Sequence, residues 1–247
     1  MEPMLEVEGL TRRYGTRVAV AGISFRIGRG ESVGLLGPNG AGKTSTLAMI
    51  SGIAKPDAGT MKFAGATGID ALKNRVGLVP QDLALFDELS AWANLQLFGG
   101  LYGLAASTLR ERADSALTLV GLADRRGDLV KSFSGGMKRR LNIAGALLHD
   151  PDLMLLDEPT VGVDPQSRNA IFENLEALKR RGKTLLYTTH YMEEAERLCE
   201  RVLIVDHGRI LADGSVAELK AQHGNLEQAF LALTGRALRD ASEAVAA

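Results

Sequence analysis

The feature that most constrains this chain is a glycine-rich loop between a short apolar segment, 33–36, and a helical run through 47–50. The loop and the residue after it are Gly37, Pro38, Asn39, Gly40, Ala41, Gly42, Lys43, Thr44 and Ser45. Glycines allow turns that bring backbone N–H groups to one point, and a helix N-terminus adds unpaired donors and a positive dipole end. Lys43 is suited to reach the β- and γ-phosphates, and the Thr44 hydroxyl to hold Mg²⁺. The loop therefore predicts a site for a nucleoside triphosphate.

Size and composition limit both the architecture and the partners. The 247 residues can form one large α/β domain or two smaller lobes, and a net charge of −1 argues against a nucleic-acid partner. The single cysteine, Cys199, excludes an intrachain disulfide and is expected as a small buried hydrophobe on the inner face of a helix. No apolar run reaches bilayer length and the first residues do not resemble a secretory signal, so we expect any membrane role to need a partner.

Hydrophobic periodicity predicts strands at both ends of the chain and helices in the middle. Strands are expected near 5–7, 23–27, 32–36, 61–63, 76–79, 153–156, 184–188, 202–205 and 209–211. From about 88 to 148 the apolar spacing is helical. A further helix over 166–181 ends in a basic cluster followed by Gly182, which favours a helix stop over nucleic-acid contact. The later strands are almost wholly apolar, which is typical of a parallel sheet covered on both faces.

Two carboxylates follow one of these apolar strands. Asp157 and Glu158 come directly after residues 153–156. Asp157 is suited to bind Mg²⁺, directly or through water, because that ion bridges phosphate oxygens in nucleotide sites. Glu158 can polarise a water for attack on the γ-phosphate. Combined with the upstream loop, the pair indicates a site that hydrolyses its nucleotide.

Other polar residues also stand at predicted strand ends. His190 follows the strand near 184–188, and Gln81 follows the strand near 76–79. Because parallel sheets bind ligands at the carboxyl ends of their strands, we expect His190 beside the phosphates. The Gln81 amide could meet the metal or the attacking water. The remaining histidines, which are expected at the surface or in turns, are His149, His207 and His223.

A second glycine pair opens another predicted helix. Ser134 is placed to cap this helix, while Gly135 and Gly136 leave its N-terminus bare for a close-approaching anion. One chain would then hold two anion sites. If the second site serves a neighbouring chain's nucleotide, two chains must pair head-to-tail about a two-fold axis.

In their order and spacing, these motifs resemble those of the nucleotide-binding subunits of the ATP-binding cassette (ABC) transporter family, over nearly all of the chain. The matching elements are an aromatic at Tyr14, the Walker A loop 37–44, the Q-loop Gln81, the signature 133–137, Walker B 153–157 with Glu158, the D-loop 162–164 and the switch His190. The signature departs from the usual pattern with Phe133 and Met137 in place of leucine and glutamine, which puts in doubt the polar contact of that glutamine. Val163 replaces a commoner leucine in the D-loop.

The resemblance implies ATP and Mg²⁺ as ligands and gives each motif a role in hydrolysis or binding. Glu158, His190 and Gln81 would act in hydrolysis. Thr44, Gln81 and Asp157 would hold the metal.

The same resemblance divides nucleotide binding between two chains. The Walker A loop through Ser45 would bind phosphate, and Tyr14 would stack on adenine. The residues that would approach the partner chain's ATP are Ser134, Gly135 and Gly136, with Ser134 and Gly136 touching its γ-phosphate. Asp164 would link the paired sites.

The family's fold class is α/β, with a P-loop NTPase core, a mostly parallel sheet, an antiparallel β subdomain on the N-terminal side and an inserted α-helical subdomain. On this chain the resemblance places the ATPase domain at 1–235 and its helical insertion at about 83–148. A short tail, 236–247, would follow, and its last residues, 241–247, are expected to fray.

Two classes of function fit this family. The chain is either an energy-coupling ATPase bound to a separate integral-membrane transporter subunit, or a soluble ATP switch of the kind seen in DNA repair or translation. A single cassette without a coiled-coil insertion favours the first class. Segments 190–196 and 225–236 resemble the export branch that handles drugs, antibiotics or lipid-linked sugars, with an importer subunit as the alternative. The chain is then expected in the cytoplasm at the inner membrane face, as a homodimer or paired with a second ABC ATPase.

An apolar and aromatic segment follows Gln81. Its large side chains are Leu83, Leu85, Phe86, Trp92, Leu97, Phe98, Leu101 and Tyr102. We expect most of them in the core. Those that stay exposed would form a groove for a cytoplasmic helix of the membrane subunit.

Overall fold

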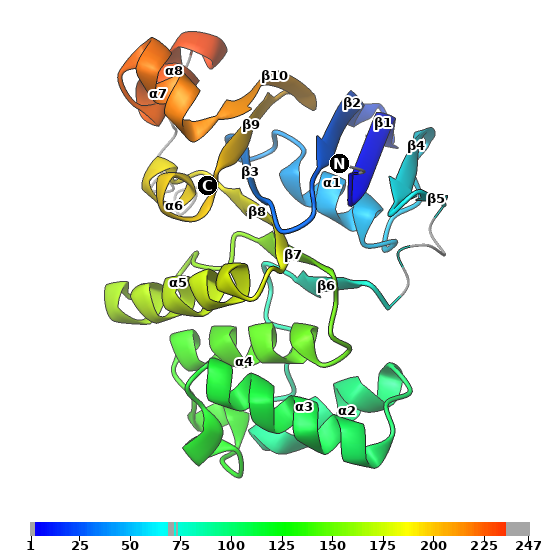
Figure 1. The fold of residues 1–247 in the computed structure, drawn as a ribbon, viewed down its shortest axis with the longest axis vertical. Coiled ribbons are helices and arrows are strands. Elements are labelled where there is room, and N and C mark those ends of the chain that lie inside the picture. The colour runs from blue at the N-terminus through cyan, green and yellow to red at the C-terminus, as the bar shows by residue number, and fades with distance from the viewer. Residues whose placement is uncertain (1–2, 69–71, 73, 236–247) are drawn as a thin grey trace.

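The computed structural model describes residues 3–68, 72 and 74–235. A six-stranded sheet runs through the middle of this structure (Figure 1). The strand order is β10-β9-β3-β8-β7-β6; the strands from β9 to β6 are parallel, and β10 pairs antiparallel at the edge. The strands are β3 (Ser32–Leu36), β6 (Val76–Val79), β7 (Leu153–Asp157), β8 (Thr184–Thr189), β9 (Arg201–Asp206) and β10 (Arg209–Ser215). Every residue of β3, β7 and β8 is buried, which confirms the prediction of a sheet covered on both faces.

A second, antiparallel sheet has the strand order β2-β1-β4-β5. Its strands are β1 (Leu5–Tyr14), β2 (Arg17–Ile27), β4 (Ala58–Phe63) and β5 (Ala66–Thr67). Helix α1 (Lys43–Ile50) packs against both sheets, because one buried cluster joins its Leu47 to Phe63 of β4 and Leu155 of β7. Enclosure on both sides explains why α1 carries apolar residues around most of its circumference.

Three helices lie between β6 and β7 in the sequence and form a layer at one end of the molecule, opposite the last two helices (Figure 1). They are α2 (Ala91–Leu101), α3 (Ala106–Leu119) and α4 (Gly135–Leu147). Together with α5 (Pro165–Arg180) and α6 (Met192–Leu198) they cover the second face of the large sheet, where Leu156 and Tyr187 join their apolar cluster. The predicted α/β fold class with an inserted helical subdomain is therefore confirmed, while its bounds at 83–148 stay a prediction.

Two further helices, α7 (Val216–His223) and α8 (Leu226–Thr234), were not predicted. A capping box begins α7: the Ser215 hydroxyl accepts from Glu218 N at 3.1 Å, and the Glu218 carboxylate accepts from Ser215 N at 3.0 Å. The Ser-x-x-Glu pattern was the available sequence signal. Residues 236–247, predicted to form the tail, lie outside the described residues. No helix within the described residues combines the length and apolarity needed to cross a bilayer.

Two side chains have surroundings that differ from the expectation. His149, expected at the surface, is buried; its ring stacks on Tyr102 with centroids 3.9 Å apart, and its Nε2 lies 3.0 Å from Val76 O. Burial lowers its pKa, so a neutral imidazole fills this core position. Cys199 is buried as expected, and burial raises its pKa to about 12, but it follows the end of α6 rather than lying within a helix.

Two adjacent glycines of α2 should respond in opposite ways to alanine. A Cβ on Gly99 would lie 2.3 Å from Leu109 Cδ1 of α3, whereas a Cβ on Gly100 would meet nothing within 4 Å. Gly99→Ala should lower the free energy of unfolding by about 1–3 kcal/mol through overpacking. Gly100→Ala should raise it by up to about 1 kcal/mol, because alanine is the better helix former. Denaturant unfolding measures both, and equal effects would contradict this packing of α2 on α3.

Candidate active site

The carboxyl ends of β3, β7 and β8 meet at one edge of the large sheet. The strand register places Leu36 opposite Thr189 and Asp157 opposite Thr188. The loops that follow these strands surround a pocket of about 580 Å³. The residues that line the pocket are Tyr14, Arg17, Ala19, Asn39, Gly40, Gly42, Lys43, Thr44, Ser45, Gln81, Glu158, Val161 and His190. This edge is where parallel sheets bind their ligands.

Close backbone packing explains why positions 37 and 42 of the loop are glycine. Gly42 has a φ of 106°, and a Cβ there would lie 2.4 Å from Ala19 O. A Cβ on Gly37 would lie 2.4 Å from Val205 O. Helix α1 begins directly after Gly42, without a side-chain cap and without an acidic residue in its first turn. Its N–H groups and dipole therefore remain suited to an anion such as phosphate.

Lys43 is buried within the loop, with only 4 % of its side chain exposed. Its Nζ donates to Gly37 O at 2.7 Å and to Pro38 O at 3.2 Å. It also lies 3.0 Å from Glu158 Oε1. The loop's own carbonyls thus hold a cation at the pocket, where it can pair with a phosphate.

Glu158 stands between Lys43 and His190. The His190 Nδ1 atom lies 3.3 Å from Glu158 Oε2. Burial raises the pKa of Glu158, but its interactions with His190 and Lys43 outweigh burial and lower that pKa to about 2. The carboxylate is therefore charged at neutral pH. Its backbone has a φ of 44°, a left-handed conformation that is unfavourable for a non-glycine residue and is often found at functional sites.

Asp157 lies beside the phosphate loop. Its Oδ1 accepts from Thr188 Oγ1 at 2.8 Å, and the same hydroxyl accepts from Glu158 N at 3.0 Å. Burial raises the pKa of Asp157, while hydrogen bonds from Thr188 and Thr44 act in the opposite direction. Asp157 and Thr44 thus bring two oxygens together, and oxygen is the ligand that Mg²⁺ prefers. Among the described residues, no group of three or more His, Cys, Asp and Glu side chains could hold a metal, so a Mg²⁺ ion here would need further ligands from phosphate or water.

Gln81 lines the pocket from the segment after β6, and a distant helix holds its backbone. Arg139 of α4 donates from Nη1 to Pro80 O at 2.8 Å and from Nη2 to Gln81 O at 2.6 Å. Arg139 is buried, with 6 % of its surface exposed. Sequence reasoning missed this residue, because an arginine within a helical pattern gives no signal that it is buried.

The second glycine pair lies outside the pocket. Ser134 caps α4, as its hydroxyl accepts from the backbone N–H three residues later at 3.2 Å, and Ser134 and Gly135 are exposed. A Cβ on Gly136 would lie 2.2 Å from Ser167 Oγ, so glycine is required where α4 meets α5. Asp164 caps α5 by accepting from Ser167 N at 2.9 Å. Gly136 and Asp164 therefore both approach Ser167, and neither lines the pocket.

The structure gathers most of the predicted site residues. Those that line the one pocket are Tyr14, Asn39, Gly40, Gly42, Lys43, Thr44, Ser45, Gln81, Glu158 and His190. Gly37, Pro38 and Ala41 complete the loop, and Asp157 adjoins it. The pocket residues that sequence reasoning missed are Arg17, Ala19 and Val161.

Comparison with known proteins yields one family and many relatives. The family described as ABC transporter matches residues 20–161. The chain is 47 % identical over 224 residues to the linearmycin resistance ATP-binding protein of Bacillus subtilis, covering 90 % of this chain and 72 % of that protein. It is 48 % identical over 220 residues to a Nod factor export ATP-binding protein I of Ralstonia nicotianae, covering 88 % and 68 %. A daunorubicin resistance ATP-binding protein of Streptomyces coeruleorubidus is 42 % identical over 223 residues, covering 89 % and 71 %.

Solved structures agree with these relatives. An ATP-binding subunit of an ABC transporter superposes with a TM-score of 0.82 at 31 % identity, over 94 % of this chain and 99 % of that one. The cbiO1 protein of Clostridium perfringens, part of the ABC transporter complex cbiONQ, superposes with a TM-score of 0.81 at 31 % identity, over 90 % and 92 %.

Lys43→Ala should abolish hydrolysis of ATP. The substitution removes the cation of the loop and leaves the buried Glu158 carboxylate without its partner at 3.0 Å. We expect phosphate release to fall by at least about 100-fold, the scale seen when one preorganised electrostatic group is lost. Lys55→Ala, at an exposed lysine, should release phosphate at the wild-type rate. Normal turnover in Lys43→Ala would exclude the loop from the chemistry.

Proposed function

Because the chain belongs to the ABC transporter family as an ATP-binding and ATP-hydrolysing subunit, we infer that two copies close head-to-tail over two ATP molecules to power export through a membrane subunit. One observation carries this proposal. The helix N-terminus at Ser134 and Gly135 is exposed and suited to an anion, yet it does not belong to the pocket that contains Lys43. A two-fold arrangement lets each copy supply this second anion site to the pocket of the other.

Within each pocket, the loop and the strand ends have separate tasks. The α1 N-terminus and Lys43 bind the phosphates. Tyr14, which is 49 % exposed at the pocket, offers its ring to adenine. Thr44, Asp157 and Gln81 would hold Mg²⁺, which would supply positive charge at the phosphates.

Glu158 and His190 act where the γ-phosphate is attacked. The Glu158 carboxylate is placed to orient and polarise the attacking water. This suits phosphoryl transfer, because its loose transition state needs positioning more than early proton removal. His190, 3.3 Å from Glu158, holds the carboxylate in place and faces the γ-phosphate.

Opening and closing of the two copies follow from the difference in ATP affinity between the closed and the open pair. ATP contacts the loop of one copy and the α4 N-terminus of the other, so it stabilises the closed pair. After hydrolysis, the separated phosphate no longer joins the two copies and the pair reopens. A ligand can shift such an equilibrium only by its differential affinity for the two states.

Glu158→Gln should trap ATP-loaded dimers in gel filtration with ATP and Mg²⁺, because closure persists when hydrolysis is slow. Adding Gly135→Asp should return the protein to monomers. A Cβ on Gly135 meets nothing within 4 Å and an acidic residue favours a helix N-terminus, so the fold should tolerate the change while its charge repels the partner's phosphate. Monomeric Glu158→Gln at saturating ATP and Mg²⁺ would contradict the head-to-tail arrangement.

A groove beside the Gln81 segment fits a helix of the membrane subunit. Its volume is about 220 Å³. It is lined by Leu78, Pro80, Ala84, Phe98, Leu101, Tyr102, Asn142, Gly145 and Ala146.

The expectation that most large apolar side chains of the segment after Gln81 lie in the core was wrong. Between 36 and 78 % of the surface is exposed at Leu83, Phe86, Leu97, Leu101 and Tyr102.

Within α2, Ala91 and Leu95 occupy the core-facing side, which leaves Leu97 and Leu101 to solvent. The exposed apolar side chains Leu101 and Tyr102 line the groove, which favours an amphipathic helix as its partner. The relatives' names concern linearmycin resistance, daunorubicin resistance and Nod factor export. We therefore propose a drug, an antibiotic or a lipid-linked compound as cargo, and a position at the cytoplasmic face of the membrane.

Leu101→Asp should weaken binding to the membrane subunit without changing hydrolysis by the isolated chain. Leu101 is 78 % exposed at the groove and away from the nucleotide pocket. Ile53→Asp is a matched control, since Ile53 is 73 % exposed outside the groove. Co-purification with the co-expressed membrane subunit measures the effect. Equal recovery of both variants would exclude the groove as the docking site.

A further inference from the structure

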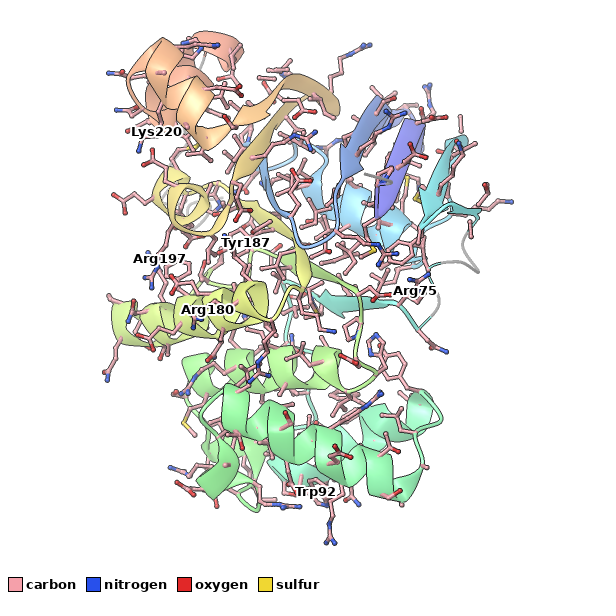
Figure 2. All side chains as sticks on the ribbon, viewed as in Figure 1. Arg75, Trp92, Arg180, Tyr187, Arg197 and Lys220 are labelled. Carbon is pink, nitrogen blue, oxygen red and sulfur yellow. The ribbon has the colours of Figure 1, made fainter. Side chains whose placement is uncertain are left out.

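A buried carboxylate lies behind the pocket, outside the set of residues that line it. Glu194 of α6 is 3 % exposed, and its hydrogen-bond partners Thr160, Tyr187 and Thr189 are each no more than 2 % exposed. Tyr187 is labelled near the centre of Figure 2, between α5 and α6. Its hydroxyl donates to Glu194 Oε2 at 2.8 Å. Three hydroxyl groups thus converge on one carboxylate in the interior.

One oxygen of Glu194 holds the turn that carries Glu158. Oε1 accepts from Thr160 Oγ1 at 2.7 Å. Thr160 lies inside a turn that Val161 N closes by donating to Glu158 O at 3.2 Å. The position of Glu158, with its left-handed backbone, is therefore fixed from behind by a side-chain contact two residues later.

The other oxygen of Glu194 holds the turn that carries His190. Oε2 accepts from Thr189 Oγ1 at 2.7 Å, and that hydroxyl accepts from Tyr191 N at 3.0 Å. The two contacts bracket His190, because Thr189 and Tyr191 are its neighbours in the chain.

A charged carboxylate is the group that suits this place. Burying a charge is unfavourable unless hydrogen bonds compensate it, and here three O–H donors do so. Arg168 Nε of α5 lies a further 4.0 Å from Oε1. An amide would offer one accepting oxygen and would direct N–H groups at hydroxyls that now donate.

We propose that Glu194 is a positioning residue that sets the spacing between Glu158 and His190. The inference rests on the proposed roles of those two residues in hydrolysis. Glu194 acts on the nucleotide only through Glu158 and His190. Each of its carboxylate oxygens holds one of the two turns that carry these residues, and His190 Nδ1 lies 3.3 Å from Glu158 Oε2. Misplacing either turn by a fraction of an ångström should slow the chemical step while leaving phosphate binding by the loop intact.

The first test is Glu194→Gln. We expect its kcat for ATP hydrolysis to fall about 10- to 100-fold while KM for ATP changes less than about threefold, as befits lost orientation rather than lost binding. Glu193→Gln removes the same charge from the exposed neighbouring position and should keep both constants. A purely structural role would lower the melting temperature of Glu194→Gln but leave kcat per folded molecule unchanged, and that result would overturn the proposal.

A second pair of variants separates position from stability, and it remains informative if Glu194→Gln does not fold. Thr160→Val keeps the shape but loses the hydroxyl that donates to Glu194, whereas Thr160→Ser keeps the hydroxyl and loses a buried methyl. We expect kcat to fall about tenfold or more in the valine variant and to stay within about threefold in the serine variant. Equal kcat values in the two variants would overturn the proposal.

Glu158→Gln is measured in parallel. If it hydrolyses ATP at the wild-type rate, the proposed role of Glu158 fails and the inference fails with it. If Glu158→Gln is inactive while Glu194→Gln and Thr160→Val retain full kcat, only the inference about Glu194 fails.

Discussion

The register between parallel strands is the constraint on which the site depends. Hydrogen bonding of β3 to β8 and of β8 to β7 sets Leu36, Thr189 and Asp157 at neighbouring levels of one edge. The phosphate loop follows directly after Leu36 in the chain, Glu158 after Asp157 and His190 after Thr189. A slip of one residue in any strand would reverse which side chains face each core and would separate the groups that meet in the pocket. Apolar residues buried on both faces, in two separate clusters, hold that register.

Burial of charged side chains is one unfavourable contribution to the stability of this arrangement. Lys43, Asp157 and Glu158 are each no more than 6 % exposed. Each is compensated by a different means: loop carbonyls for Lys43, hydroxyl donors for Asp157, and a cation with an imidazole for Glu158. Removing one partner of such a group leaves the other uncompensated, which is why buried pairs are unfavourable to break. Fixed dipoles and charges of this kind need little reorganisation when charge develops in a reaction.

Local sequence predicted the parts of the site that local backbone determines. The glycine loop needs its residue types for its own turns, and Asp157, Glu158 and His190 follow recognisable apolar strands, so their positions could be inferred without a structure. Arg139, Thr188 and Glu194 could not be found in this way, because each of them has at least one hydrogen-bond partner more than 30 residues away in the chain. The burial of His149, which follows α4, depends likewise on Tyr102, which follows α2. The exposure of Leu101 was missed for the same reason, since helical periodicity does not show which apolar residues a neighbouring layer will cover.

The guanidinium of Arg139 holds backbone that belongs to both the groove and the nucleotide pocket. Pro80 lines the groove and Gln81 lines the nucleotide pocket, and Arg139 bonds to both of their carbonyls. Pro80 and Gln81 are joined by one peptide bond, so a displacement of Pro80 at the groove would move Gln81 at the pocket without moving the sheet. Arg139 lies in α4, the helix that Ser134 caps, so its hydrogen bonds also connect α4 to Pro80 and Gln81. One buried cation thus fixes the two adjacent peptide carbonyls that lie between the groove and the nucleotide pocket.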